Sequence, residues 1–140
     1  MKVNKLTPNF EVKDIKETVN FYQSVLGFSL VMAVPEKQDG IEQSLIDNKE
    51  YVYALVSKDN VEMMFQRTDS FKQDLTFAKD LPFGASVSFY MEIEGLDDFY
   101  NNIKDKVKEI TKPKVAWYGM KEFYTKDTNG YILGFAEKTE

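Results

Sequence analysis

The pattern of apolar and polar residues in the first half of the chain predicts a strand followed by an amphipathic helix. Residues 6–12 alternate as a half-buried strand does, and the apolar residues that follow recur at the spacing of one buried helical face. Asp14 stands at the N-cap position with Glu17 three residues later, as in a capping box, and Gly27 is placed to end the helix. The predicted buried face of this helix consists of Ile15, Val19, Tyr22 and Leu26.

Short β-rich runs replace the helical pattern after this helix. They predict strands at 28–34, 51–57 and 61–66, and the polar residues 58–60 join the last two strands as a hairpin. The intervening segment 35–50 is rich in polar residues and contains a glycine. It is expected to form a loop or an edge segment that covers one side of the sheet.

The second half of the chain begins with the same order of elements. A strand is predicted at 87–93, and the helix that follows carries Asp97 and Asp98 in its first turn. From Ile15 to Leu96 the shift is 81 residues, and the apolar spacing of the first helix recurs position for position. The predicted buried face of this second helix consists of Leu96, Tyr100, Ile103 and Val107.

Three further strands complete the second half, with Asn129-Gly130 as the turn before the last one. These strands are predicted at 115–118, 122–126 and 131–137. Self-similarity at one fixed shift indicates a duplicated unit. We therefore expect one α+β domain over residues 1–140, built from two βαβββ repeats at about 1–67 and 84–140. Two curved mixed sheets side by side would leave a concave cleft, which is a natural place for a small molecule.

Composition narrows the chemistry that such a cleft can perform. The chain has 43% hydrophobic residues, which suffices for a packed core, but it has no cysteine and no histidine. The commonest general base and nitrogen ligand are therefore missing, and an intracellular compartment is the default. A net charge of −5 argues against nucleic acid as a partner. No apolar run approaches the roughly 18 residues of a membrane span, so we expect a cytoplasmic protein without a membrane partner.

Two blocks near the ends of the chain carry a family resemblance. The first is Phe-Glu-Val-Lys-Asp-Ile at 10–15, followed by Phe-Tyr at 21–22 and Val-Leu-Gly-Phe at 25–28. The second is Trp-Tyr-Gly-Met-Lys-Glu-Phe at 117–123 with Asp-Thr-Asn-Gly-Tyr-Ile-Leu-Gly-Phe at 127–135. Together they resemble the vicinal oxygen chelate superfamily, which comprises glyoxalase I, extradiol dioxygenases, fosfomycin-resistance enzymes and bleomycin-resistance proteins.

The second block resembles the bleomycin-resistance-like branch of that superfamily. The resemblance implies the glyoxalase/bleomycin-resistance fold, in which two βαβββ repeats form a curved mixed β-sheet cleft. It also implies a homodimer whose clefts lie at or near the subunit interface. In this branch the protein sequesters a drug and breaks no bond.

The resemblance also locates the positions where metal-dependent relatives carry histidine, glutamine or glutamate ligands. In this chain those positions hold Thr7, Met64, Ser88 and Gly134. A thioether, two hydroxyls and a glycine do not form a transition-metal site, so we predict no metal and no cofactor. A register slip would bring in Glu11 or Glu62, but it would also turn the side chain to the other face of the strand.

Strand alternation, counted from the four positions that the resemblance implies, predicts most of the side chains that line the cleft, because residues two apart share a face. Three aromatic residues near the second block are expected to add to this lining. The predicted ligand-binding residues are Asn9, Glu11, Glu62, Met64, Gln66, Ser88, Tyr90, Glu92, Trp117, Tyr118, Tyr124 and Ile132. The residues predicted to pack under the helices on the opposite faces are Phe10, Val12, Phe89, Ile93, Leu133 and Phe135. Aromatic walls beside carboxylates suit a planar or cationic compound such as an antibiotic.

The sequence therefore favours a metal-independent small-molecule-binding protein, and it identifies no catalytic residue. Two alternatives stay open. One is a lyase, isomerase or dioxygenase-like enzyme of the same fold that uses a hard metal or a carboxylate base, with Glu62 and Glu92 as the candidate bases. The other is a scaffold or regulatory module whose cleft is filled by its own side chains.

Overall fold

The computed structural model describes residues 1–84 and 87–140. The chain divides into two compact units, Met1–Phe83 and Gly84–Glu140, which we call unit 1 and unit 2. Each unit contains a four-stranded mixed sheet and a helix in the order that the repeat predicts. The fold class is therefore confirmed as α+β with two βαβββ modules.

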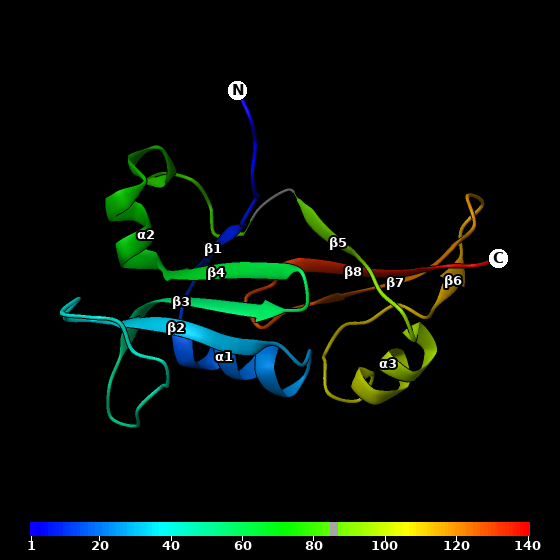
Figure 1. Cartoon of the computed structure of the whole chain (residues 1–140), viewed down its shortest axis with the longest axis horizontal. Helices are drawn as coiled ribbons and strands as arrows, with labels where there is room; N and C mark the ends of the chain where they lie inside the picture. The colour runs from blue at the N-terminus through cyan, green and yellow to red at the C-terminus, as the bar shows by residue number, and fades with distance from the viewer. Residues whose placement is uncertain (85–86) are drawn as a thin grey trace. The chain divides into compact units, whose positions relative to one another are not determined.

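Unit 1 forms one mixed sheet with the strand order β1-β4-β3-β2 (Figure 1). The pair β1–β4 is parallel, and the other two pairs are antiparallel. The elements of this unit are β1 (Asn9–Val12), α1 (Ile15–Ser24), β2 (Ser29–Pro35), β3 (Tyr51–Lys58), β4 (Val61–Arg67), α2 (Thr68–Asp74) and the 3-10 helix η1 (Thr76–Ala78).

Helix α1 forms where the sequence predicts it. The Asp14 side chain accepts a hydrogen bond from the backbone N–H of Glu17 at 3.0 Å, which satisfies one of the open donors of the first turn. The four residues predicted for its buried face are 3% exposed or less, and Leu26 lies just beyond the end of the helix at Ser24. Gly27 ends the helix with a φ of 77°, a conformation that favours glycine.

Two features of unit 1 differ from the sequence-based expectation. The first strand begins at Asn9 rather than at residue 6, although the carbonyl of Pro8 still accepts the N–H of Met64 at 2.9 Å. Helix α2 was not predicted at all. None of its side chains is buried, so its sequence has no apolar face to recognise, and polar contacts hold it instead.

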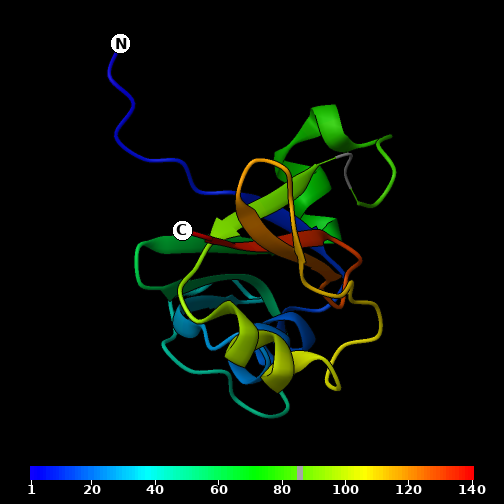
Figure 2. The same ribbon diagram turned by 90° about the vertical axis from the view of Figure 1, so that its right-hand side faces the viewer.

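Unit 2 repeats the topology with the strand order β5-β8-β7-β6. Its elements are β5 (Ser88–Glu92), α3 (Leu96–Ile103), β6 (Lys114–Val115), β7 (Met120–Lys126) and β8 (Ile132–Lys138). Figure 2 shows α3 against one face of this sheet, where Phe99 packs edge-on against Phe135 at 4.9 Å between ring centroids. The Glu137 carboxylate caps this helix, because it accepts the N–H groups of Gly95 and Leu96 at 2.8 and 3.0 Å.

Two predictions for unit 2 were wrong. Helix α3 ends at Ile103, so Val107 lies outside it; the N–H of Lys106 instead turns back to the carbonyl of Ile103 at 2.8 Å. The predicted strand at 115–118 is only the two-residue β6, because the chain turns at Gly119 with a φ of 86°. Trp117 and Tyr118 therefore lie in the turn before β7 rather than on a strand.

The predicted division of each sheet into two faces holds for most of the core. Phe10, Val12, Leu133 and Phe135 are buried, whereas Phe89 and Ile93 are only half-buried. Within the described ranges, none of the helices has the length and apolar character that crossing a bilayer requires.

Candidate functional site

The five ligand-binding residues predicted in the first repeat lie on one face of the sheet of unit 1. Asn9 pairs with Met64 and Glu11 with Gln66 across the parallel β1–β4 pair. Because alternate residues of a strand share a face, Glu62 of β4 lies on that same face. This face is opposite to the one that α1 covers, where Phe10 and Phe65 are buried.

Two of these residues are engaged in a polar network with α2. The side-chain N–H of Asn9 donates a hydrogen bond to the side-chain oxygen Oε1 of Gln66 at 2.9 Å. The amide nitrogen of Gln66 donates to Ser70 Oγ at 2.9 Å and to Asp74 Oδ2 at 2.8 Å. Gln66 is 7% exposed and so is Glu11, whereas Glu62 is half-buried and forms an ion pair with Lys5. The polar residues Asn9 and Gln66 on this face therefore position the short helix α2.

Unit 2 presents a different surface at the corresponding face of its sheet. Tyr90 and Tyr124 both lie across from Gly134, on β5 and β7 respectively. Glu122 is two residues before Tyr124 on the same face, and its Oε2 atom accepts hydrogen bonds from the Tyr90 and Tyr118 hydroxyls, the latter at 2.6 Å. We call Tyr90, Tyr118, Tyr124 and Glu122 the tyrosine cluster.

Gly134 makes the close packing of this cluster possible. A Cβ atom at this position would lie 2.7 Å from Cε1 of Tyr124 and 3.4 Å from Cδ1 of Tyr90. The two rings thus occupy the space over the glycine that any other side chain would need. Both tyrosines are among the ligand-binding residues predicted from the sequence, and Glu122 is not, although strand alternation from Tyr124 places it on the same face.

The tyrosine cluster lies at the surface of unit 2. Tyr90 and Tyr118 are 46% and 50% exposed, and Trp117 is 95% exposed with its ring edge-on to Tyr118 at 5.3 Å between centroids. Ile132, on the same face of β8, is 38% exposed. Exposed aromatic rings around a carboxylate form a surface that favours planar and cationic molecules.

The other two predicted residues of unit 2 do not join the cluster through any contact that the structure shows. Ser88 is exposed at the start of β5. The Glu92 side chain is 60% exposed, with Lys138 Nζ at 4.0 Å. Solvent competes with such a long, exposed ion pair, so it contributes little to stability.

The hydrogen bonds to Glu122 make both phenols weaker acids. The bond to the carboxylate raises the pKa of Tyr90 and of Tyr118 above 10, and desolvation raises both further. Because the folded-state pKa is raised, this pairing stabilises the folded protein fully below about pH 10 and is lost as the pH rises through the raised values. Both hydroxyls therefore stay protonated donors at neutral pH.

We expect Glu122→Gln to bring the ionisation of these two tyrosines back towards pH 10. A spectrophotometric titration of the phenolate absorbance compares the variant with the wild type. A part of the absorbance change should move to lower pH in the variant, and Glu94→Gln, an exposed carboxylate of the same unit, should leave the curve unchanged. Superimposable curves for Glu122→Gln and wild type would contradict the observed hydrogen bonds.

The four metal-ligand positions implied by the resemblance do not fit a metal ion. Thr7 precedes β1, Ser88 is exposed, and the space over Gly134 is filled by Tyr124. Among residues 1–84 and 87–140, no group of three or more acidic, histidine or cysteine side chains is arranged to hold a metal ion. These four positions offer only one thioether and two hydroxyl groups as donors, and such groups do not form a transition-metal site.

The sequence matches the model of the Glyoxalase/Bleomycin resistance protein/Dioxygenase superfamily over residues 7–135. This chain belongs to that superfamily. No curated protein matches it.

Solved structures show the same fold at low sequence identity. A glyoxalase-related enzyme from Clostridium phytofermentans is 19% identical with a TM-score of 0.66, covering 99% of this chain and 98% of that one. TnmS3, an antibiotic-binding protein from Streptomyces sp. CB03234, is 15% identical with a TM-score of 0.67 and 99% coverage of both chains. The bleomycin-binding protein of Streptomyces verticillus, in complex with copper(II)-bleomycin, is 17% identical with a TM-score of 0.60, covering 100% of this chain and 99% of that one.

Proposed function

We propose that this protein binds a planar or cationic aromatic compound, such as an antibiotic, at the tyrosine cluster of unit 2 and does so without a metal. The observation that carries the proposal is the Glu122 carboxylate, which accepts hydrogen bonds from the hydroxyls of two exposed tyrosines. The carboxylate supplies a countercharge, and the rings supply flat apolar surface. Antibiotic-binding members of the same fold support this choice of ligand class. We further propose that the protein works in the cytoplasm as a homodimer that sequesters the compound.

The carboxylate-base alternative has less support. A carboxylate that removes a proton from carbon needs a buried setting to be a strong enough base. The Glu92 side chain is 60% exposed, and the Glu62 side chain is 31% exposed and paired with Lys5. Binding without bond cleavage is therefore the better account of these residues.

The single tryptophan makes the proposal directly testable, because Trp117 packs on Tyr118 at the edge of the cluster. Metal-free bleomycin and other cationic aromatic antibiotics are titrated while the Trp117 fluorescence is recorded. We expect a saturable change for at least one compound, with the same Kd in the presence of EDTA. Glu122→Ala should weaken that binding about tenfold or more, because a charge-assisted contact is lost.

Glu94→Ala removes the same charge from an exposed site of unit 2 and should leave the Kd unchanged. If both variants weakened binding of the compound equally, the loss would come from the change in overall charge and not from a contact with Glu122. A fluorescence change that needs a divalent metal ion, or binding that Glu122→Ala leaves intact, would contradict the proposal.

A further inference from the structure

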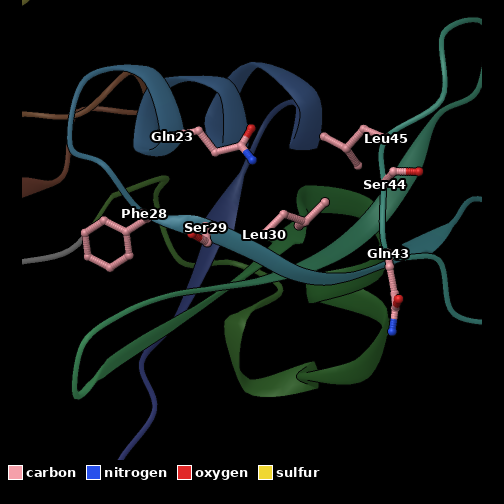
Figure 3. A pocket seen from close by; sticks show the side chains of 7 residues that line it. All are labelled: Gln23, Phe28, Ser29, Leu30, Gln43, Ser44 and Leu45. Atoms are coloured by element: carbon pink, nitrogen blue, oxygen red, sulfur yellow. The ribbon is translucent and has the colours of Figure 1, made fainter.

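A pocket lies at the free edge of the sheet in unit 1. Its volume is about 420 Å³, within the range of small-molecule sites. It opens between the start of edge strand β2, the end of α1 and the loop that follows β2 (Figure 3). The lining residues are Gln23, Phe28, Ser29, Leu30, Gln43, Ser44 and Leu45.

The pocket exists because the loop pairs with β2 at one point and then leaves it. Ala33 and Glu42 form an isolated antiparallel bridge, with N–H to carbonyl distances of 2.7 and 2.8 Å. Continued pairing would bring residues 43–45 alongside the first residues of β2, as a fifth strand would lie. Instead the pocket separates the two segments.

The Tyr51 hydroxyl holds the loop in this position. Tyr51 is 1% exposed, its hydroxyl donates to Glu42 Oε1 at 2.7 Å, and it accepts the N–H of Ile46 at 2.9 Å. Lys49 pairs with the other oxygen of Glu42. The residues on both sides of segment 43–45 are therefore held in place, and these contacts keep the pocket open.

The lining indicates the class of ligand. In Figure 3 the side chains of Gln23, Leu30 and Leu45 point toward the pocket. Those of Gln43 and Ser44 point away from it, so these two residues line it with backbone. No lining residue carries a charge. This lining offers an amide side chain and peptide groups for hydrogen bonds and two leucines for apolar contact. A neutral amide with an apolar side chain can use both, because it can bind at a strand edge as an added strand segment does.

We propose that this edge pocket binds small neutral amide-bearing molecules with an apolar side chain. This site is separate from the one proposed for aromatic cations, and neither depends on the other. The charged analogues of such a molecule should bind more weakly, because the lining offers no countercharge for a charge that leaves water.

The test uses N-acetyl-leucinamide as the probe and NMR amide shifts of the whole chain as the readout. We expect saturable shifts at 28–30 and 43–45 and in the Gln23 side-chain amide, with a Kd of about a few millimolar for so small a probe. N-acetyl-leucine, which is an anion, and leucinamide, which is a cation, should each bind about tenfold more weakly or not at all.

Two variants locate the contacts. Gln23→Ala should weaken the probe about threefold to tenfold through the lost hydrogen bond, and Leu45→Ala should weaken it by a similar factor through lost apolar contact. Gln73→Ala and Leu75→Ala alter the same residue types at exposed positions of the same unit and should have no effect. The proposal is overturned if the probe causes no shifts at the pocket up to about 50 mM, if it shifts the tyrosine cluster instead, or if all three compounds bind equally.

Discussion

Phe65→Ala is expected to lower the free energy of unfolding of unit 1 by about 3–5 kcal/mol, the cost of removing a fully buried aromatic side chain. Phe65 is 0% exposed and lies at the centre of the packing between β4 and α1. Its ring centroid is 4.7 Å from that of Tyr22 and 5.6 Å from that of Phe10. A domain has only about 5–15 kcal/mol of stability in total, so this loss is a large part of it.

Urea unfolding followed by circular dichroism measures the difference. Phe77→Ala is the matched control, because Phe77 lies in the same unit and is 98% exposed. The control should change the free energy of unfolding by less than about 0.5 kcal/mol. A Phe65→Ala protein as stable as this control would show that the observed core packing is wrong.

The elements that the sequence predicts well are those whose signals are local. Helix α1 has its apolar spacing, its Asp14 cap and its Gly27 stop within one short segment, and the structure confirms each of them. The face assignment of β1 and β4 follows from alternation, counted from the positions that the family resemblance gave, and the structure puts Asn9 and Gln66 on one face of the sheet.

The features that the sequence did not predict depend on contacts between distant residues. Helix α2 is held through Gln66 of the preceding strand and has no buried side chain. The N-terminus of α3 is capped by Glu137, which lies 42 residues beyond Gly95 in the chain. The spacing of apolar and polar residues along the chain does not predict these hydrogen bonds, because a polar residue in a strand is equally consistent with an exposed position.

The candidate site shows the same limit. The tyrosines of the cluster were predicted as ligand-binding residues, but Glu122, the common partner of Tyr90 and Tyr118, was not. Tyr118 reaches that carboxylate from a turn, which the sequence had assigned to a strand. The proposed ligand surface combines a turn with three strands, so it can be recognised only when the turn geometry is known.

Gly134→Ala is expected to lower the free energy of unfolding of unit 2 by about 1–3 kcal/mol, because the new methyl group overlaps the Tyr124 ring. A Cβ at Gly134 meets Tyr124 Cε1 at 2.7 Å, and the glycine is buried in the sheet, so the ring has to move. The same substitution in a Tyr124→Ala background should cost clearly less, which a double-mutant cycle measures by chemical unfolding.

Gly40→Ala provides the control for a glycine without this constraint, since no atom lies within 4 Å of a Cβ built there. It should be close to neutral or slightly stabilising. If Gly134→Ala costs the same with and without the Tyr124 ring, the ring does not occupy this space. If removal of the ring relieves the cost as expected, the position at which the family resemblance implies a metal ligand is occupied by aromatic packing. A glutamate introduced there would then have to displace Tyr124 before it could reach a metal ion.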